Sequence, residues 1–122
     1  MEDMKKLYEN KVKLLSNELT ACLCKLDGEI EKIGAGIIAG YTFTYEGQEV
    51  FSIMYYDSYK YKITVYDKYT NGYKILNVNP DNSNISEVYD IMERKYEEHK
   101  EYSNLIEPIN DMISILASYT NK

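Results

Sequence analysis

Residues that build metal sites and disulfides are scarce in this chain of 122 residues, which has one histidine, two cysteines and no tryptophan. Cys22 and Cys24 are two residues apart in a predicted helix, so their side chains point to different sides and do not share a metal ion or form an easy disulfide. His99 has no second histidine or cysteine pair near it, so the spacing that zinc requires is missing. We therefore expect no metal and no cofactor.

Motifs that mark common enzymes are also missing. The chain has no GxGxxG after a strand, no GxxxxGK[ST] and no GxSxG. Gly34, Gly36 and Gly40 follow a predicted helix and enter a predicted strand, which is the reverse of the order in a phosphate-binding loop. Because catalysis needs converging groups with tuned acidity, and no such group is evident, we predict that the protein is not an enzyme.

Long apolar runs and an excess of positive charge are absent as well. The longest uncharged run, 33–45, has thirteen residues including three glycines, which is too short for a bilayer span. The opening residues lack a secretory apolar region, so we expect a cytoplasmic protein with no membrane partner. Fourteen Lys and Arg residues against twenty Asp and Glu give a net charge of -6, which argues against binding of duplex nucleic acid.

The composition that remains is that of one folded domain over residues 1–122. Hydrophobic residues make up 44% of the chain and charged residues 28%, with both signs mixed. The residues with AT-rich codons, Ile, Lys, Asn and Tyr, together account for 50 positions. This bias indicates an AT-rich genome, such as that of a low-GC bacterium or its phage.

The first predicted element is one long amphipathic helix over 3–33. At about 1.5 Å per residue it would be roughly 46 Å long, whereas a compact domain of this size is roughly 35 Å across. The helix would then overhang its domain with an apolar seam, which favours self-association as a homodimer. The alternative is a break near Asp27-Gly28, with the helix packed wholly on its own sheet. The seam consists of Val12, Leu15, Leu19, Cys22 and Leu26.

A four-stranded antiparallel meander is predicted over 36–78, where the apolar period changes to two. Its strands are 36–45, 48–56, 59–69 and 73–78. Its turns are Glu46-Gly47, Asp57-Ser58 and Asn71-Gly72. The pairs expected from these turns are Phe43 with Val50, Met54 with Tyr61, Ser52 with Ile63, and Val65 with Val78. This register places Val50 and Met54 on the core face, and Phe51, Ile53 and Tyr55 on the other face.

Two C-terminal helices are predicted at 85–102 and 104–119. Asn84 with Glu87, and Asn104 with Glu107, have the spacing of capping boxes. Pro108 falls in the first turn of the last helix, where its missing N–H costs no hydrogen bond. The predicted fold is α+β: a long N-terminal helix, a four-stranded meander and two C-terminal helices. The buried stripe expected on the last helix is Leu105, Ile109, Met112, Ile113 and Leu116.

Two surfaces are candidates for function. The first is an acidic ridge on one side of the 85–102 helix, formed by Asp90, Glu93, Glu97 and Glu101. The second is a face of the meander that carries tyrosine and lysine, formed by Tyr55, Lys60, Lys62, Tyr66, Lys68 and Tyr73.

Three hypotheses follow from these surfaces. An acidic ridge suits a small non-enzymatic inhibitor, immunity or accessory protein that binds a protein partner stoichiometrically, for example a basic nucleic-acid-binding protein. Aromatic side chains interleaved with lysine suit a nucleotide or single-stranded nucleic acid. The helical seam, or the exposed face of the sheet, suits a structural homo-oligomer. If a helix covers the tyrosine and lysine face, the hypothesis of nucleotide or single-stranded nucleic acid binding is excluded.

Overall fold

The computed structural model describes residues 2–56, 60–79 and 83–121 and shows an α+β fold with an antiparallel five-stranded sheet and two helices. The strands are ordered β1-β2-β3-β4-β5 across the sheet. The elements are α1 (Glu2–Lys25), β1 (Glu29–Ala35), β2 (Ile38–Tyr45), β3 (Gln48–Tyr56), β4 (Lys60–Asp67), β5 (Gly72–Val78) and α2 (Ser83–Thr120). The sequence predicted the class, but not the fifth strand or the joining of the last two helices.

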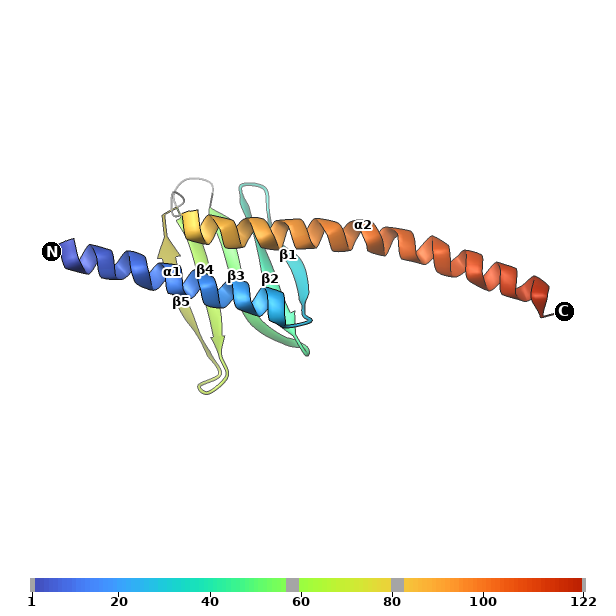
Figure 1. Cartoon of the computed structure of the whole chain (residues 1–122), viewed down its shortest axis with the longest axis horizontal. Helices are drawn as coiled ribbons and strands as arrows, with labels where there is room; N and C mark the ends of the chain where they lie inside the picture. Colours follow the sequence, from blue (N-terminus) through green and yellow to red (C-terminus); the bar gives the residue numbers. More distant parts are fainter. Residues whose placement is uncertain (1, 57–59, 80–82, 122) are drawn as a thin grey trace.

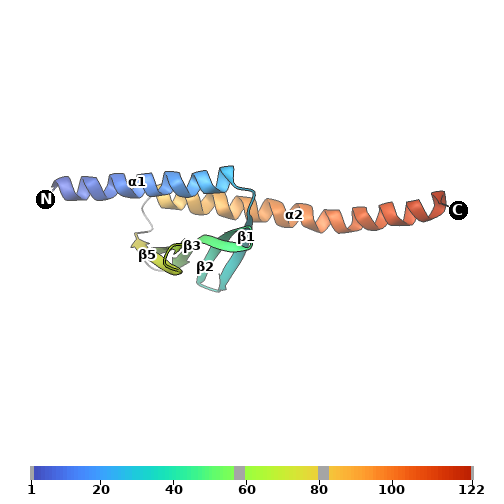
Figure 2. The same cartoon turned by 90° about the horizontal axis from the view of Figure 1, so that it is seen from below.

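Both helices lie on the same face of the sheet, next to each other and running in the same direction (Figure 1). Seen from below, the sheet has helices on one side only (Figure 2). The first turns of α1 extend beyond the sheet at one end, and the second half of α2 extends much further at the other (Figure 1). Within the described residues, no helix is long and apolar enough to cross a membrane.

The first helix is shorter than predicted, because the chain turns at Asp27-Gly28 and becomes an edge strand. The pairing of Ile30 with Phe43 shows how β1 adds to the sheet. A Cβ at Gly28 would lie 2.4 Å from the Thr44 carbonyl oxygen and 2.5 Å from the Phe43 ring, so only glycine allows this approach. The predicted helix over 3–33 was therefore wrong beyond residue 25. The alternative prediction, a break near Asp27-Gly28, gave the right place.

The meander has the predicted strand order, but its register differs. As a result, the side chains of one strand lie on the faces opposite to those predicted. The turn at Glu46-Gly47 is confirmed, with positive φ at both residues and Tyr45 paired with Gln48. A bulge between Phe43 and Thr44 then moves the pairing by one residue, so Phe43 pairs with Phe51 rather than Val50.

A second shift of one residue follows between β3 and β4, where Met54 pairs with Lys62 rather than Tyr61. The two odd shifts cancel for β4, which keeps its predicted faces, whereas β3 alone is inverted. Phe51 and Ile53 are therefore buried under the helices, at 1% and 0% exposure. Between β4 and β5 the pairing differs by four residues from the predicted one, since Val65 pairs with Lys74 rather than Val78. Four is an even number, so the side chains of β5 also keep their predicted faces. The predicted turn at Asp57-Ser58 lies outside the described residues.

The core lies between the sheet and the two helices. It takes Leu19 and Leu23 from α1, and Ile85 and Met92 from the first half of α2. The largest fully buried side chains are Phe43, Phe51, Ile53, Ile63, Ile85, Met92, Val78 and Val88.

The last two predicted helices form one continuous helix, α2, with Pro108 in its interior. Proline removes the N–H that would bind the Asn104 carbonyl. Both residues are exposed, so water can bind that carbonyl and the helix continues. The predicted break at 103 and the cap at Asn104 were therefore wrong.

Candidate interaction surfaces

The tyrosine and lysine face is open, because the helices cover the opposite face of the sheet (Figure 2). Lys62 pairs with Asn77 and Tyr66 with Tyr73, all on the uncovered side. The Tyr66 hydroxyl donates to Asn71 Oδ1 at 2.9 Å, and its ring centroid lies 5.5 Å from that of Tyr73. Exposed Lys60 shares this side of β4, since it alternates with the buried Tyr61.

Two members of that predicted set lie elsewhere. Tyr55 is on the covered face, with its ring centroid 5.3 Å from Tyr61 and 6.4 Å from Tyr89, because the inversion of β3 moves it there. Lys68 lies in the turn after β4, with its Nζ 5.5 Å from the Tyr69 ring centroid. Beside this turn is a hollow of about 620 Å³ lined by Tyr66 and Lys68 among others.

The acidic ridge forms a continuous exposed strip on α2. Asp90, Glu93, Glu97 and Glu101 are all exposed. Its charges affect the tyrosines that pack beneath it. Burial is the largest cause of the raised pKa of Tyr41, and the negative charges of Glu93 and Glu97 raise this pKa further. The ridge is therefore a negative surface next to a cluster of buried and half-buried rings.

That ring cluster joins the sheet to α2. The Tyr41 ring centroid is 5.4 Å from Tyr89 and 5.5 Å from Tyr96, and Tyr61 is 5.5 Å from Tyr89. Burial raises the pKa of Tyr89 to about 12, with smaller contributions from Tyr41 and Glu93. No motif in the sequence indicated that these four rings meet.

Alkaline pH should destabilise the protein through Tyr89. Below pH 10 the phenol is protonated in both the folded and the unfolded chain; between pH 10 and about 12 only the unfolded chain has lost its proton. The free energy of unfolding should therefore fall as pH rises through this window. Urea unfolding between about pH 9 and pH 11 checks this, and Tyr89→Phe should flatten the decrease. An equal slope in the variant would contradict the role of Tyr89.

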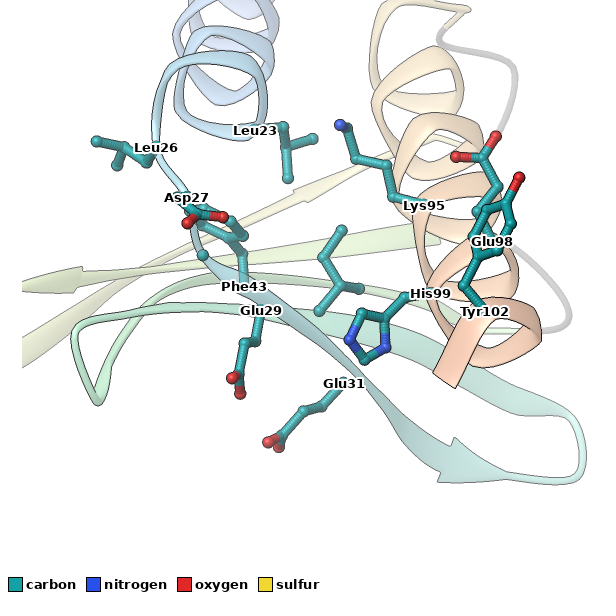
Figure 3. Close-up of a pocket in the computed structure, with 12 residues that line it drawn as sticks. Leu23, Leu26, Asp27, Glu29, Glu31, Phe43, Lys95, Glu98, His99 and Tyr102 are labelled. Atoms are coloured by element: carbon teal, nitrogen blue, oxygen red, sulfur yellow. The ribbon is translucent and has the colours of Figure 1, made fainter. Parts of the chain in front are cut away.

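A cleft of about 750 Å³ lies where α1 ends, between β1 and α2, and it contains His99 (Figure 3). The His99 ring reaches toward β1, whereas Glu29 and Glu31 point away from α2 (Figure 3). The described residues that line the cleft include no serine or cysteine. The carboxylates do not converge on His99, and we assign no chemistry to this cleft.

The two cysteines lie on different sides of α1, and both are free thiols. Cys22 is half-buried, and its thiol pKa is raised by burial and then by Glu18, whereas Cys24 is exposed. No group of three or more His, Cys, Asp or Glu residues in the described part of the chain could hold a metal ion.

The apolar seam of α1 has a partner within the chain. Val12 and Leu19 are buried in the core, and Leu15, Cys22 and Leu26 pack against it half-buried. A second copy cannot reach Val12 or Leu19 without displacing the sheet or α2. Self-association remains a prediction, and these five residues are a poor site for it.

The stripe expected to be buried on the last helix is instead exposed, on the half of α2 that extends past the sheet (Figure 1). Nine large apolar side chains there are 51% to 68% exposed. We call them the projecting stripe: Tyr102, Leu105, Ile106, Ile109, Met112, Ile113, Ile115, Leu116 and Tyr119. A smaller exposed group, Met4, Leu7, Tyr8 and Leu14, lies on α1.

Comparisons of the chain with protein-family models, with curated proteins and with solved structures found no match.

Proposed function

We propose that this chain is a small non-enzymatic protein-binding module, of the inhibitor, immunity or accessory type, that acts stoichiometrically through the projecting half of α2. The observation that carries the proposal is the projecting stripe. Soluble monomers seldom expose contiguous apolar patches of more than a few hundred Å². Nine large apolar side chains, each more than half exposed on one helix, exceed that level.

The form of the stripe favours a helical protein partner. An amphipathic helix binds a groove or another helix through residues three and four apart, which is the spacing of the stripe. The stretch 101–121 has three acidic residues and no lysine or arginine, so its polar side lacks the basic residues with which amphipathic helices bind anionic lipid. The acidic ridge precedes the stripe on the same helix and would favour a partner with basic residues nearby.

Capture experiments with three tagged full-length forms test the proposal: wild type, Ile109→Glu in the stripe, and Ser114→Glu on the opposite side of α2. We expect wild type and Ser114→Glu to retain a protein in a fixed molar ratio, and Ile109→Glu to lose it, because a charge in an apolar contact is costly. A co-expressed second copy of this chain counts as that protein. Retention by Ile109→Glu would contradict the proposal.

One observation favours a second candidate, a binder of nucleotides or single-stranded nucleic acid. The face with Lys60, Lys62, Tyr66 and Tyr73 is not covered by either helix (Figure 2). Exposed rings and lysines on a sheet can stack bases and bind phosphates. If the three forms retain no protein, and a labelled oligonucleotide binds wild type but not Tyr66→Ala, this candidate replaces the first.

A further inference from the structure

The projecting stripe has the heptad spacing of a coiled coil. Tyr102, Leu105, Ile109, Met112, Leu116 and Tyr119 follow one another at intervals of three and four. Ile106, Ile113 and Ile115 flank this seam and widen it. Tyr102, the first residue of the seam, borders the cleft beside β1, and the rest of the seam lies on the half of α2 that extends past the sheet and α1 (Figure 1), so we expect its partner to come from outside the described residues.

Read from either end, the stripe has nearly the same order of residues. The matching pairs are Tyr102 with Tyr119, Leu105 with Leu116, Ile106 with Ile115, and Ile109 with Met112. Ser103 and Ser118 also match, on the polar side of the helix. The centre of this near-palindrome lies between Asn110 and Asp111.

Such a sequence is complementary to itself when two helices run in opposite directions. With a twofold axis between Asn110 and Asp111, Tyr102 faces the second copy's Tyr119, Leu105 faces its Leu116, and Ile109 faces its Met112. Each layer then joins side chains of similar size, and each contact occurs twice, as in a twofold-symmetric interface. We propose that the projecting stripe pairs with the stripe of a second copy of this chain, forming an antiparallel helical dimer.

The length of α2 fits this overlap. In the same alignment, residue 120 lies opposite residue 101, so the second helix ends beside Tyr102, which lines the cleft next to β1. The overlap over 102–119 is about 27 Å long. A stable interface buries roughly 800 Å² per partner, and nine large apolar side chains more than half exposed supply surface of that order.

Charge also favours the antiparallel arrangement. Glu107 and Asp111 lie on the side of α2 opposite the stripe, so neither is buried in the pair. The acidic ridges of the two copies lie at opposite ends of an antiparallel pair, whereas a parallel pair would bring them together. Since each copy has a net charge of -6, the antiparallel pair has the smaller repulsion.

Light scattering and sedimentation of the full chain test the dimer. We expect wild type and Ser114→Glu to have twice the mass of one 14.3 kDa chain, and Ile109→Glu to dimerise at least about 100-fold more weakly. Ile109 lies outside the core, so the variant should remain folded, which its circular dichroism spectrum checks, although loss of the dimer should lower the unfolding midpoint. A wild-type monomer at high micromolar concentration, or an Ile109→Glu dimer of wild-type affinity, would overturn the proposal.

Crosslinking tests the direction of the helices. Leu105→Cys and Leu116→Cys are made separately in a Cys24→Ser background and mixed under oxidising conditions. An antiparallel pair gives the 105–116 disulfide, which mass spectrometry identifies. Disulfides only between like positions would show a parallel pair and would overturn the proposal.

The second-copy inference rests on the proposed function, yet the two can fail separately. A monomeric wild type that captures another protein, with capture lost in Ile109→Glu, overturns the second-copy inference and leaves the proposed function intact. A monomer with no capture that depends on the stripe overturns both.

Discussion

Replacing Ile53 by alanine should lower the free energy of unfolding by about 2 to 5 kcal/mol. Ile53 is fully buried between the sheet and the helices, and it is paired with Tyr41 and Ile63. The substitution removes apolar contacts and leaves a cavity that neighbouring strands cannot fill. Denaturant unfolding monitored by circular dichroism measures the change.

Met54→Ala is the matched control for this prediction. Met54 is the next residue in β3 and lies on the opposite face, where it is half-buried. Its truncation should lower the free energy of unfolding by only about 1 kcal/mol. The register expected from turn lengths alone would reverse the two effects, so a larger loss for Met54→Ala would contradict the register described above.

Replacing Gly28 by alanine should lower the free energy of unfolding by about 1 to 3 kcal/mol. The new Cβ would lie 2.5 Å from the Phe43 ring and 2.4 Å from the Thr44 carbonyl oxygen, and the second of these is backbone that cannot rotate away. Because Phe43 is in the core and pairs with Ile30, relief of the clash has to move β1 or the ring. Denaturant unfolding again measures the loss.

Gly72→Ala provides the control for the glycine prediction. At Gly72 an added Cβ would meet only the Thr70 hydroxyl oxygen, at 3.4 Å. We expect a change within about 0.5 kcal/mol. Loss of backbone freedom in the unfolded chain would by itself stabilise both variants, so equal losses for Gly28→Ala and Gly72→Ala would contradict a specific effect of the contacts with Phe43 and Thr44.

Local sequence patterns were sufficient to predict several features of this protein. The alternation of apolar residues placed four of the five strands to within a few residues, because side chains of a half-buried strand alternate between faces. The turn at Glu46-Gly47 was predictable because glycine readily adopts positive φ. The acidic ridge was predictable because its four residues have helical spacing and remain exposed.

Other features depended on contacts between distant segments. Residues 29–33 have a pattern compatible with a helix, yet they lie in β1, because the edge of β2 offers backbone partners that a helix end does not. The face of β3 was decided by a bulge at Phe43 and Thr44, and no local pattern distinguishes one residue of shift from none.

The sequence by itself determined that residues 102–119 have one apolar side and one polar side, because that property follows from helical spacing alone. Only the tertiary structure decided that this side is exposed. One face of the sheet is spanned by α1 and the first half of α2, and among the described residues no helix or strand packs along the second half (Figure 1). An amphipathic pattern shows that a helix needs an apolar contact, but whether that contact lies within the chain depends on how far the helix extends past its own core.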